Sequence, residues 1–189
     1  LLTLSGHKLH APKGVGALFI RKGITFTPFV VGGHQEKNRR GGTENVPSII
    51  GLGRACELAK KYMSEEQILV KQLRDKVEDE ILEKAPDVRV NGHKTKRLPN
   101  TTNLSFEFVE GEAILLLLNE RGICASSGSA CTSGSLEPSH VLRAMGVPFT
   151  AVHGSVRLSL SRYNTIEEVD YIVEHLPPII RRLREISPY

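Results

Sequence analysis

Residues 102–108 read TNLSFEF, and the alternation in this stretch decides the fold class of the region around it. Leu104, Phe106 and Phe108 are separated by single polar residues. Such a period of two predicts a strand with one face buried and one face in solvent. The elements on either side of this strand then decide whether it belongs to an all-β or a mixed domain.

Helical and strand patterns alternate outward from this strand. The expected elements are a strand VRV at 88–90, a helix at 111–120, a short strand GIC at 122–124, a short helix within 138–146, a strand SVRLSLS at 155–161 and a helix at 166–186. Thr165 is the predicted N-cap of the last helix, and Pro177-Pro178 should kink or break it. The alternation predicts a compact α/β domain over residues 63–189.

The first 62 residues have a different organisation. VGALFIRKG predicts a strand over 15–21, and GGHQEKNRRGGTENVPS at 32–48 is a Gly-rich polar loop. Pro47 suits the first turn of a helix, and a second helix is expected over 64–84 with a capping box at its start. The opening LLTLSGHK has no initiator Met and resembles a strand entered midway, so we expect the chain to be part of a longer polypeptide.

Composition excludes several classes of protein. Of 189 residues, 40% are hydrophobic and 24% charged, which is ordinary for a globular chain. The net charge of +4 is spread along the chain, and no block of Lys and Arg is interleaved with aromatic residues, so nucleic-acid binding has little support. The longest apolar run, AILLLL at 113–118, is too short to span a membrane. Three cysteines form no disulfide framework and no zinc-type spacing is present, which favours a reducing, cytoplasmic setting without a metal site.

Two Gly-rich stretches near the N-terminus could bind an anion. In SGHKLHAPKGVG, Lys8 follows Ser5 and His7, and a lysine in a desolvated or cationic setting can act as a nucleophile. A surface lysine beside a turn is the alternative, and spacing alone favours it. In RRGGTEN at 39–45, turn amides, two arginines and Thr43 suit a phosphate, although Gly-rich basic loops are common.

Two further candidates lie in the second half of the chain. Cys131 is within CASSGSACTSGS at 124–135, a small, polar stretch that predicts a mobile loop. Arg157 shares a strand face with serines and could bind a carboxylate with its rigid fork, or could equally be a solvated surface residue. Cys124 at a strand end and Cys56 on a helix are expected to be packing residues.

Five motifs together resemble one known family. They are SGHKLHAPKGVGALFIRKG, GGHQEKNRRGGTENVPSIIGLG, LPNTTNLSF, SSGSACTSGSLEPSHVLRAMG and SVRLSLSRYNT. Their order is similar to that in NifS/IscS-type cysteine desulfurases, which are fold-type I enzymes that use pyridoxal phosphate. The resemblance implies an α/β fold in which residues 1–62 are the end of the large cofactor-binding domain. Residues 63–189 would be the small C-terminal domain that carries the cysteine loop.

The resemblance also implies a role for each candidate residue. Lys8 matches the Schiff-base lysine, Ser5 and His7 match phosphate ligands of the same subunit, and Thr43 matches a phosphate ligand donated across a homodimer interface. Arg157 matches the arginine that binds the substrate carboxylate. Cys131 matches the persulfide cysteine and could also contact an iron–sulfur cluster transiently. The stacking aromatic ring, the Asp at the pyridine nitrogen and a Gln of the family match nothing here, so the chain alone should be an incomplete catalyst.

The implied activity converts L-cysteine to L-alanine and leaves the sulfur on Cys131, for delivery to an iron–sulfur scaffold protein. SGSLEPSHVLRAMG is closer to the nitrogen-fixation branch than to the housekeeping branch. A selenocysteine lyase or another enzyme of the same fold is an alternative, and so is a non-catalytic sulfur-carrier fragment. The presence of Cys131 within SGSAC argues against the lyase.

Overall fold

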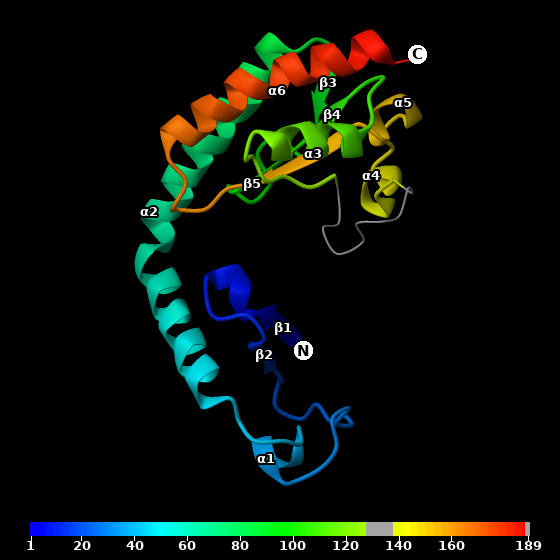
Figure 1. The fold of residues 1–189 in the computed structure, drawn as a ribbon. Coiled ribbons are helices and arrows are strands. Elements are labelled where there is room, and N and C mark those ends of the chain that lie inside the picture. Colours follow the sequence, from blue (N-terminus) through cyan, green and yellow to red (C-terminus); the bar gives the residue numbers. More distant parts are fainter. Residues whose placement is uncertain (128–137, 188–189) are drawn as a thin grey trace. The chain divides into compact units, whose positions relative to one another are not determined.

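A computed structural model describes residues 1–127 and 138–187 of the chain (Figure 1). By its contacts the chain forms two compact units, residues 1–64 and residues 65–189. Within the described ranges, no helix is long and apolar enough to cross a membrane.

The first unit begins with a hairpin of two strands, β1 (Leu2–Ser5) and β2 (Gly16–Phe19). The strands are antiparallel, with Leu2 opposite Phe19 and Ser5 opposite Gly16. The 3-10 helix η1 (Gly6–Leu9) follows β1 directly. The strand at the start of the sequence is therefore present as predicted, and the strand predicted over 15–21 is shorter at both ends.

The helix α2 (Val46–Lys84) follows the short helix α1 (Gln35–Asn38) and the Gly-rich loop. The prediction of two helices, one from Pro47 and one over 64–84, is wrong, because α2 is continuous over 39 residues. No Gly or Pro occurs between Ala59 and Ser64, and the Lys and Met residues there are good helix formers. Ser64 is consequently an interior residue of α2 and not a cap.

The second unit contains a three-stranded antiparallel sheet in the order β3-β4-β5. Its strands are β3 (Val88–Val90), β4 (Thr101–Phe106) and β5 (Ser155–Ser159), as the alternating patterns predict. Residues opposite each other across a ladder share a face. The apolar face carries Val88, Val90, Thr102, Leu104, Phe106, Val156 and Leu158. The opposite face carries Arg89, Asn103, Ser105, Ser155 and Arg157.

Three helices cover the apolar face in one hydrophobic core: the second half of α2, α3 (Gly111–Glu120) and α6 (Ile166–Ile186). Figure 1 shows α6 lying along the second half of α2, and Lys76 on α2 forms an ion pair with Asp170 on α6 at 2.8 Å. A smaller apolar cluster joins α4 (His140–Ala144) to α5 (Phe149–Val152). The predicted α/β content of this region is therefore confirmed, with α5 as an element that the sequence reasoning missed.

The prediction that β4 is half-buried is wrong. Thr102 and Ser105, on opposite faces of the strand, are both fully buried. The reason is that β4 is the central strand of the sheet. Phe108 lies beyond its end with φ 64° and is 39% exposed, so it does not continue the alternation.

The predicted strand GIC at 122–124 is also absent. Two residues after the end of this predicted strand, Ser126 forms an isolated β-bridge with Arg157, in which Ser126 N donates to Arg157 O at 3.1 Å. The chain makes a tight turn at the end of α3, where Gly122 has φ 73°, and it first pairs with β5 beyond residue 124. Among the described residues before 128, Ser126 is therefore the position at which this segment pairs with β5.

The last helix has the predicted bounds and cap. Thr165 and Glu168 form a reciprocal capping box, in which Glu168 N donates to Thr165 Oγ1 and Thr165 N donates to Glu168 Oε2. The predicted break at Pro177-Pro178 is wrong, because α6 continues through both prolines. Buried Ile179 and Ile180 follow the prolines and pack in the core, which offsets the lost hydrogen bonds.

Candidate functional site

The lysine turn, residues 5–8, is built from the end of β1 and the start of η1. Gly6 is buried, and its N–H donates to Val15 O at 2.8 Å. A Cβ on Gly6 would lie 2.8 Å from that oxygen and 2.9 Å from Val15 Cγ1. The turn is therefore tied to the start of β2 by its own backbone, at a position where only glycine fits without a shift.

The turn presents three exposed side chains, those of Ser5, His7 and Lys8. None of the three makes a side-chain hydrogen bond or an ion pair with another described residue. A hydroxyl, an imidazole and an ammonium group are therefore available together on four consecutive residues. This donor set suits a phosphate, and the lysine amine suits a carbonyl carbon.

We predict that Gly6→Ala destabilises the lysine turn. The added methyl group meets a backbone oxygen, so the free energy of unfolding should fall by about 1–3 kcal/mol. Gly53→Ala is the matched control, because Gly53 is inside α2 and its Cβ would meet nothing within 4 Å. That control should be neutral or stabilising by about 1 kcal/mol at most. Urea titration of both variants measures the difference, and equal stabilities would contradict the constraint at Gly6.

Thr43 lies on the loop between α1 and α2. The loop is tied internally, since Gly41 N donates to Val30 O at 2.8 Å and Gly42 N donates to Gln35 Oε1 at 3.1 Å. Thr43 itself is exposed, and no hydrogen bond among the described residues connects it with the lysine turn. The structure therefore groups Ser5, His7 and Lys8 and leaves Thr43 on a separate loop.

Arg157 is on the polar face of the sheet in the second unit. It is half-buried on β5, directly opposite Asn103 on β4. Both of its backbone hydrogen-bonding groups are satisfied by Ser126, but its guanidinium has no partner in the described part of the chain. An unpaired guanidinium on a rigid strand can bind a carboxylate with two parallel hydrogen bonds.

The predictions for the three cysteines have two outcomes. Cys131 lies outside the described residues. Cys124 and Cys56 are exposed, so the prediction that both are packing residues is wrong. Their neighbours Ile123 and Ala55 occupy the buried positions instead, at 7% and 6% exposure. The described residues also contain no group of three His, Cys, Asp or Glu that could hold a metal ion.

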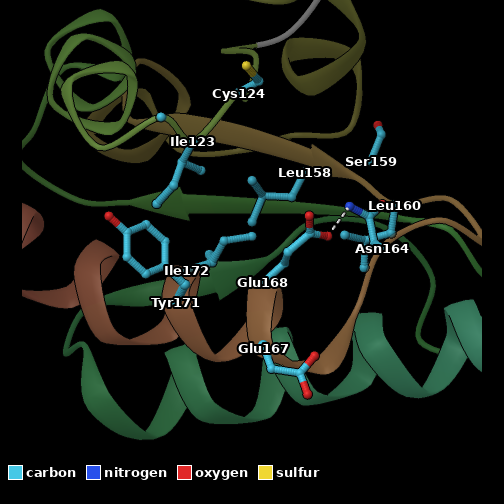
Figure 2. Close-up of a pocket in the computed structure, with 11 residues that line it drawn as sticks. Ile123, Cys124, Leu158, Ser159, Leu160, Asn164, Glu167, Glu168, Tyr171 and Ile172 are labelled. Atoms are coloured by element: carbon cyan, nitrogen blue, oxygen red, sulfur yellow. Dashed lines mark hydrogen bonds between the residues drawn. The ribbon is translucent and has the colours of Figure 1, made fainter.

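A pocket of about 570 Å³ lies between the 122–124 segment, the end of β5 and the start of α6 (Figure 2). Cys124 is at its rim, and none of the other residues with a predicted role lines it. Glu168 in this pocket accepts hydrogen bonds from Asn164 Nδ2 at 2.9 Å and from the backbone of Thr165, which lower the pKa of its carboxyl group. This carboxylate caps α6, so the pocket and the predicted site are separate features.

Sequence reasoning missed Asn91 and Asn103, which share the polar face with Arg157. Asn91 Nδ2 donates to Asn103 Oδ1 and to Ser105 Oγ, each at 2.6 Å. The alternation of TTNLS at 101–105 could have indicated that Asn103 lies on the polar face of its strand, because it places Asn103 opposite to the face of Leu104. The register that puts Asn103 beside Arg157 depends on strand pairing, which the alternation alone does not specify.

Comparisons with known proteins agree with this fold. Residues 1–172 match the family model described as aminotransferase class-V. The chain is 62% identical over 189 residues to cysteine desulfurase 2 of Trichormus variabilis, covering all of this chain and 47% of that protein. It is 61% identical to cysteine desulfurase NifS of Azotobacter vinelandii, with the same coverage. The X-ray structure of a NifS-like protein from Rickettsia africae matches with a TM-score of 0.84 and 36% identity, over 95% of this chain and 47% of that one.

The fold and the lysine turn first define a class: an α/β protein that presents an exposed lysine beside hydroxyl and imidazole donors. The chain belongs to the class-V aminotransferase family. The predicted resemblance to NifS-type proteins is confirmed, and so is mixed α/β content within that fold. The chain spans about half the length of the curated relatives it matches.

Proposed function

We propose that this chain is part of a cysteine desulfurase, which converts L-cysteine to L-alanine and retains the sulfur as a persulfide on Cys131. The observation that carries the proposal is the lysine turn, where Lys8 lies beside Ser5 and His7 and has no hydrogen-bond or ion-pair partner among the described residues. The names of relatives at 62% and 61% identity support the same activity.

We propose pyridoxal phosphate as the cofactor because the donor set of the lysine turn fits it. Ser5 Oγ and the His7 ring would hydrogen-bond the phosphate, and the Lys8 amine would hold the cofactor's carbonyl carbon. Thr43 would serve the phosphate of the neighbouring subunit in a homodimer. When bound, the cofactor withdraws electrons from the α-carbon of the substrate.

Each protein group then has one task. Arg157 holds the substrate carboxylate, and the Lys8 amine moves a proton at the α-carbon. The Cys131 thiolate attacks the substrate sulfur, so that a new S–S bond forms while the Cβ–S bond of the substrate breaks. The substrate carbon is reduced and Cys131 is oxidised to Cys131–S–SH, so the products are L-alanine and the persulfide, with no other oxidant required.

The exposed apolar surface of the first unit supports a role within a longer polypeptide. Phe29 is 99% exposed, Val31 81% and Phe19 62%, and both hydrophobic clusters of the described residues lie in the second unit. Apolar surface of this kind is normally covered by another segment or subunit. We propose that residues 1–62 complete a large cofactor domain and residues 63–189 form the small C-terminal domain, as the motif order implies.

The remaining proposals concern the sulfur acceptor, the cellular location and the biological role of the enzyme. We propose an iron–sulfur scaffold protein as the acceptor of sulfur from Cys131 and a cytoplasmic location. The similarity to NifS of Azotobacter vinelandii favours a contribution to nitrogen fixation.

The direct test is product formation by the longer enzyme. With L-cysteine and a reductant that releases the persulfide, we expect alanine and sulfide in equal amounts. L-selenocysteine supplied as the only substrate distinguishes a lyase of the same fold. Turnover of selenocysteine alone, with no alanine from L-cysteine, would contradict the proposal.

A further inference from the structure

The polar face of the sheet carries a row of side chains that extends the arginine site. Asn91, directly after β3, lies beside Asn103 on β4, which lies beside Arg157 on β5, since Asn91 N donates to Asn103 O and Asn103 is the register partner of Arg157. We propose that Asn103, oriented by Asn91, donates a second hydrogen bond to the carboxylate held by Arg157. This inference rests on the proposed function.

Strand pairing brings Asn103 and Arg157 within reach of one small anion. Residues directly opposite across an antiparallel ladder have Cβ atoms about 4.5–5.5 Å apart. Both side chains are half-buried on the same face. A carboxylate bound by the guanidinium would therefore lie over the same part of the sheet as the Asn103 amide.

Asn91 determines which end of the Asn103 amide faces Arg157. Asn91 is 7% exposed, and its Nδ2 donates to Asn103 Oδ1 at 2.6 Å from the β3 side. Because the oxygen of the Asn103 amide accepts from Asn91, its Nδ2 is the end of the amide that this hydrogen bond leaves available. Asn103 Nδ2 has no partner among the described residues, which leaves a donor available next to the unpaired guanidinium.

The charge on this face also suits an anion. The neighbouring row consists of Arg89, Ser105 and Ser155, and the row beyond Arg157 pairs Thr101 with Ser159. These rows contain no Asp or Glu that would neutralise Arg157 or repel a carboxylate.

The test compares Asn103→Asp and Asn103→Ala in the longer, cofactor-loaded enzyme. Asn103→Asp keeps the oxygen that Asn91 binds and replaces the donor with an anion, so KM for L-cysteine should rise about 100-fold. Asn103→Ala should raise KM about 10-fold, the effect of losing one hydrogen bond to a charged group. Calorimetry with the product L-alanine should give the same losses in affinity without turnover. Binding of cysteamine, which lacks the carboxylate, should change less than twofold.

Ser105→Ala is the matched control, because it removes the other acceptor of Asn91 and leaves Asn103 in place. Its KM and L-alanine affinity should stay near wild type. Equal effects of Ser105→Ala and Asn103→Ala, or an unchanged KM in Asn103→Asp, would overturn the inference while the proposed function stands. Absence of alanine production by the wild-type enzyme would instead mean that the proposed function fails and this inference with it.

Discussion

Lys8→Ala should reduce alanine formation from L-cysteine by about 10²–10⁴-fold in the longer enzyme, because the proposed function makes Lys8 the amine that holds the cofactor and moves the α-proton. The purified variant should also lose the yellow colour of the cofactor-loaded protein. The fold should be unaffected, since the Lys8 side chain is exposed and makes no contact by hydrogen bond or ion pair within the described residues. Thermal unfolding measured beside activity separates these effects.

Two further variants make the Lys8 test specific. Lys8→Arg keeps the positive charge but provides no amine, so it should be as inactive as Lys8→Ala. Lys13→Ala removes another exposed lysine five residues away and should retain full activity. Normal colour and turnover in Lys8→Ala, or their loss in Lys13→Ala, would contradict the assignment.

Cys131→Ala should reduce alanine and sulfide formation below about a thousandth of the wild-type rate, because no thiolate remains to attack the substrate sulfur. The variant should stay yellow and should still bind L-cysteine, since the lysine turn and Arg157 are unchanged. A spectral titration with L-cysteine measures binding, and product assays measure turnover. The combination of normal binding with lost turnover distinguishes sulfur transfer from cofactor chemistry.

Cys124→Ala is the control for this prediction. Cys124 is exposed beside the pocket of Figure 2, forms no disulfide with another described residue, and should be replaceable within about 0.5 kcal/mol of stability. Its turnover should stay near wild type. If Cys124→Ala loses turnover while Cys131→Ala keeps it, Cys124 is the sulfur carrier.

Much of the fold of the second unit could be predicted because local signals and packing agree there. Thr165 and Glu168 form the expected capping box, and the helix over 111–120 has the expected bounds. The failures occur where tertiary packing overrides a local signal. Pro177-Pro178 remains helical because the residues after it are held in the core, and the centre of the sheet buries Ser105 despite its polar side chain.

The lysine turn could be located from the sequence because its residues are contiguous. Ser5, His7 and Lys8 fall on one turn, so spacing along the chain and proximity in space coincide. The polar neighbours of Arg157 on the sheet could not be found in the same way, because they are distant from it in sequence. Asn103 lies opposite Arg157 only through strand register, and Asn91 reaches this face by pairing with Asn103. The sequence likewise does not show that Cys124 and Cys56 are exposed, because this depends on the packing that buries their neighbours Ile123 and Ala55 instead.

The most direct test of the central claim is the mass of the peptide that contains Cys131 after the longer enzyme reacts with L-cysteine. The enzyme should be used without reductant, and the thiols should be alkylated before digestion. The account predicts one additional sulfur atom on Cys131, none on Cys124 or Cys56, and one alanine released for each persulfide formed. Additional sulfur on another cysteine, or alanine formation with Cys131 unmodified, would contradict it.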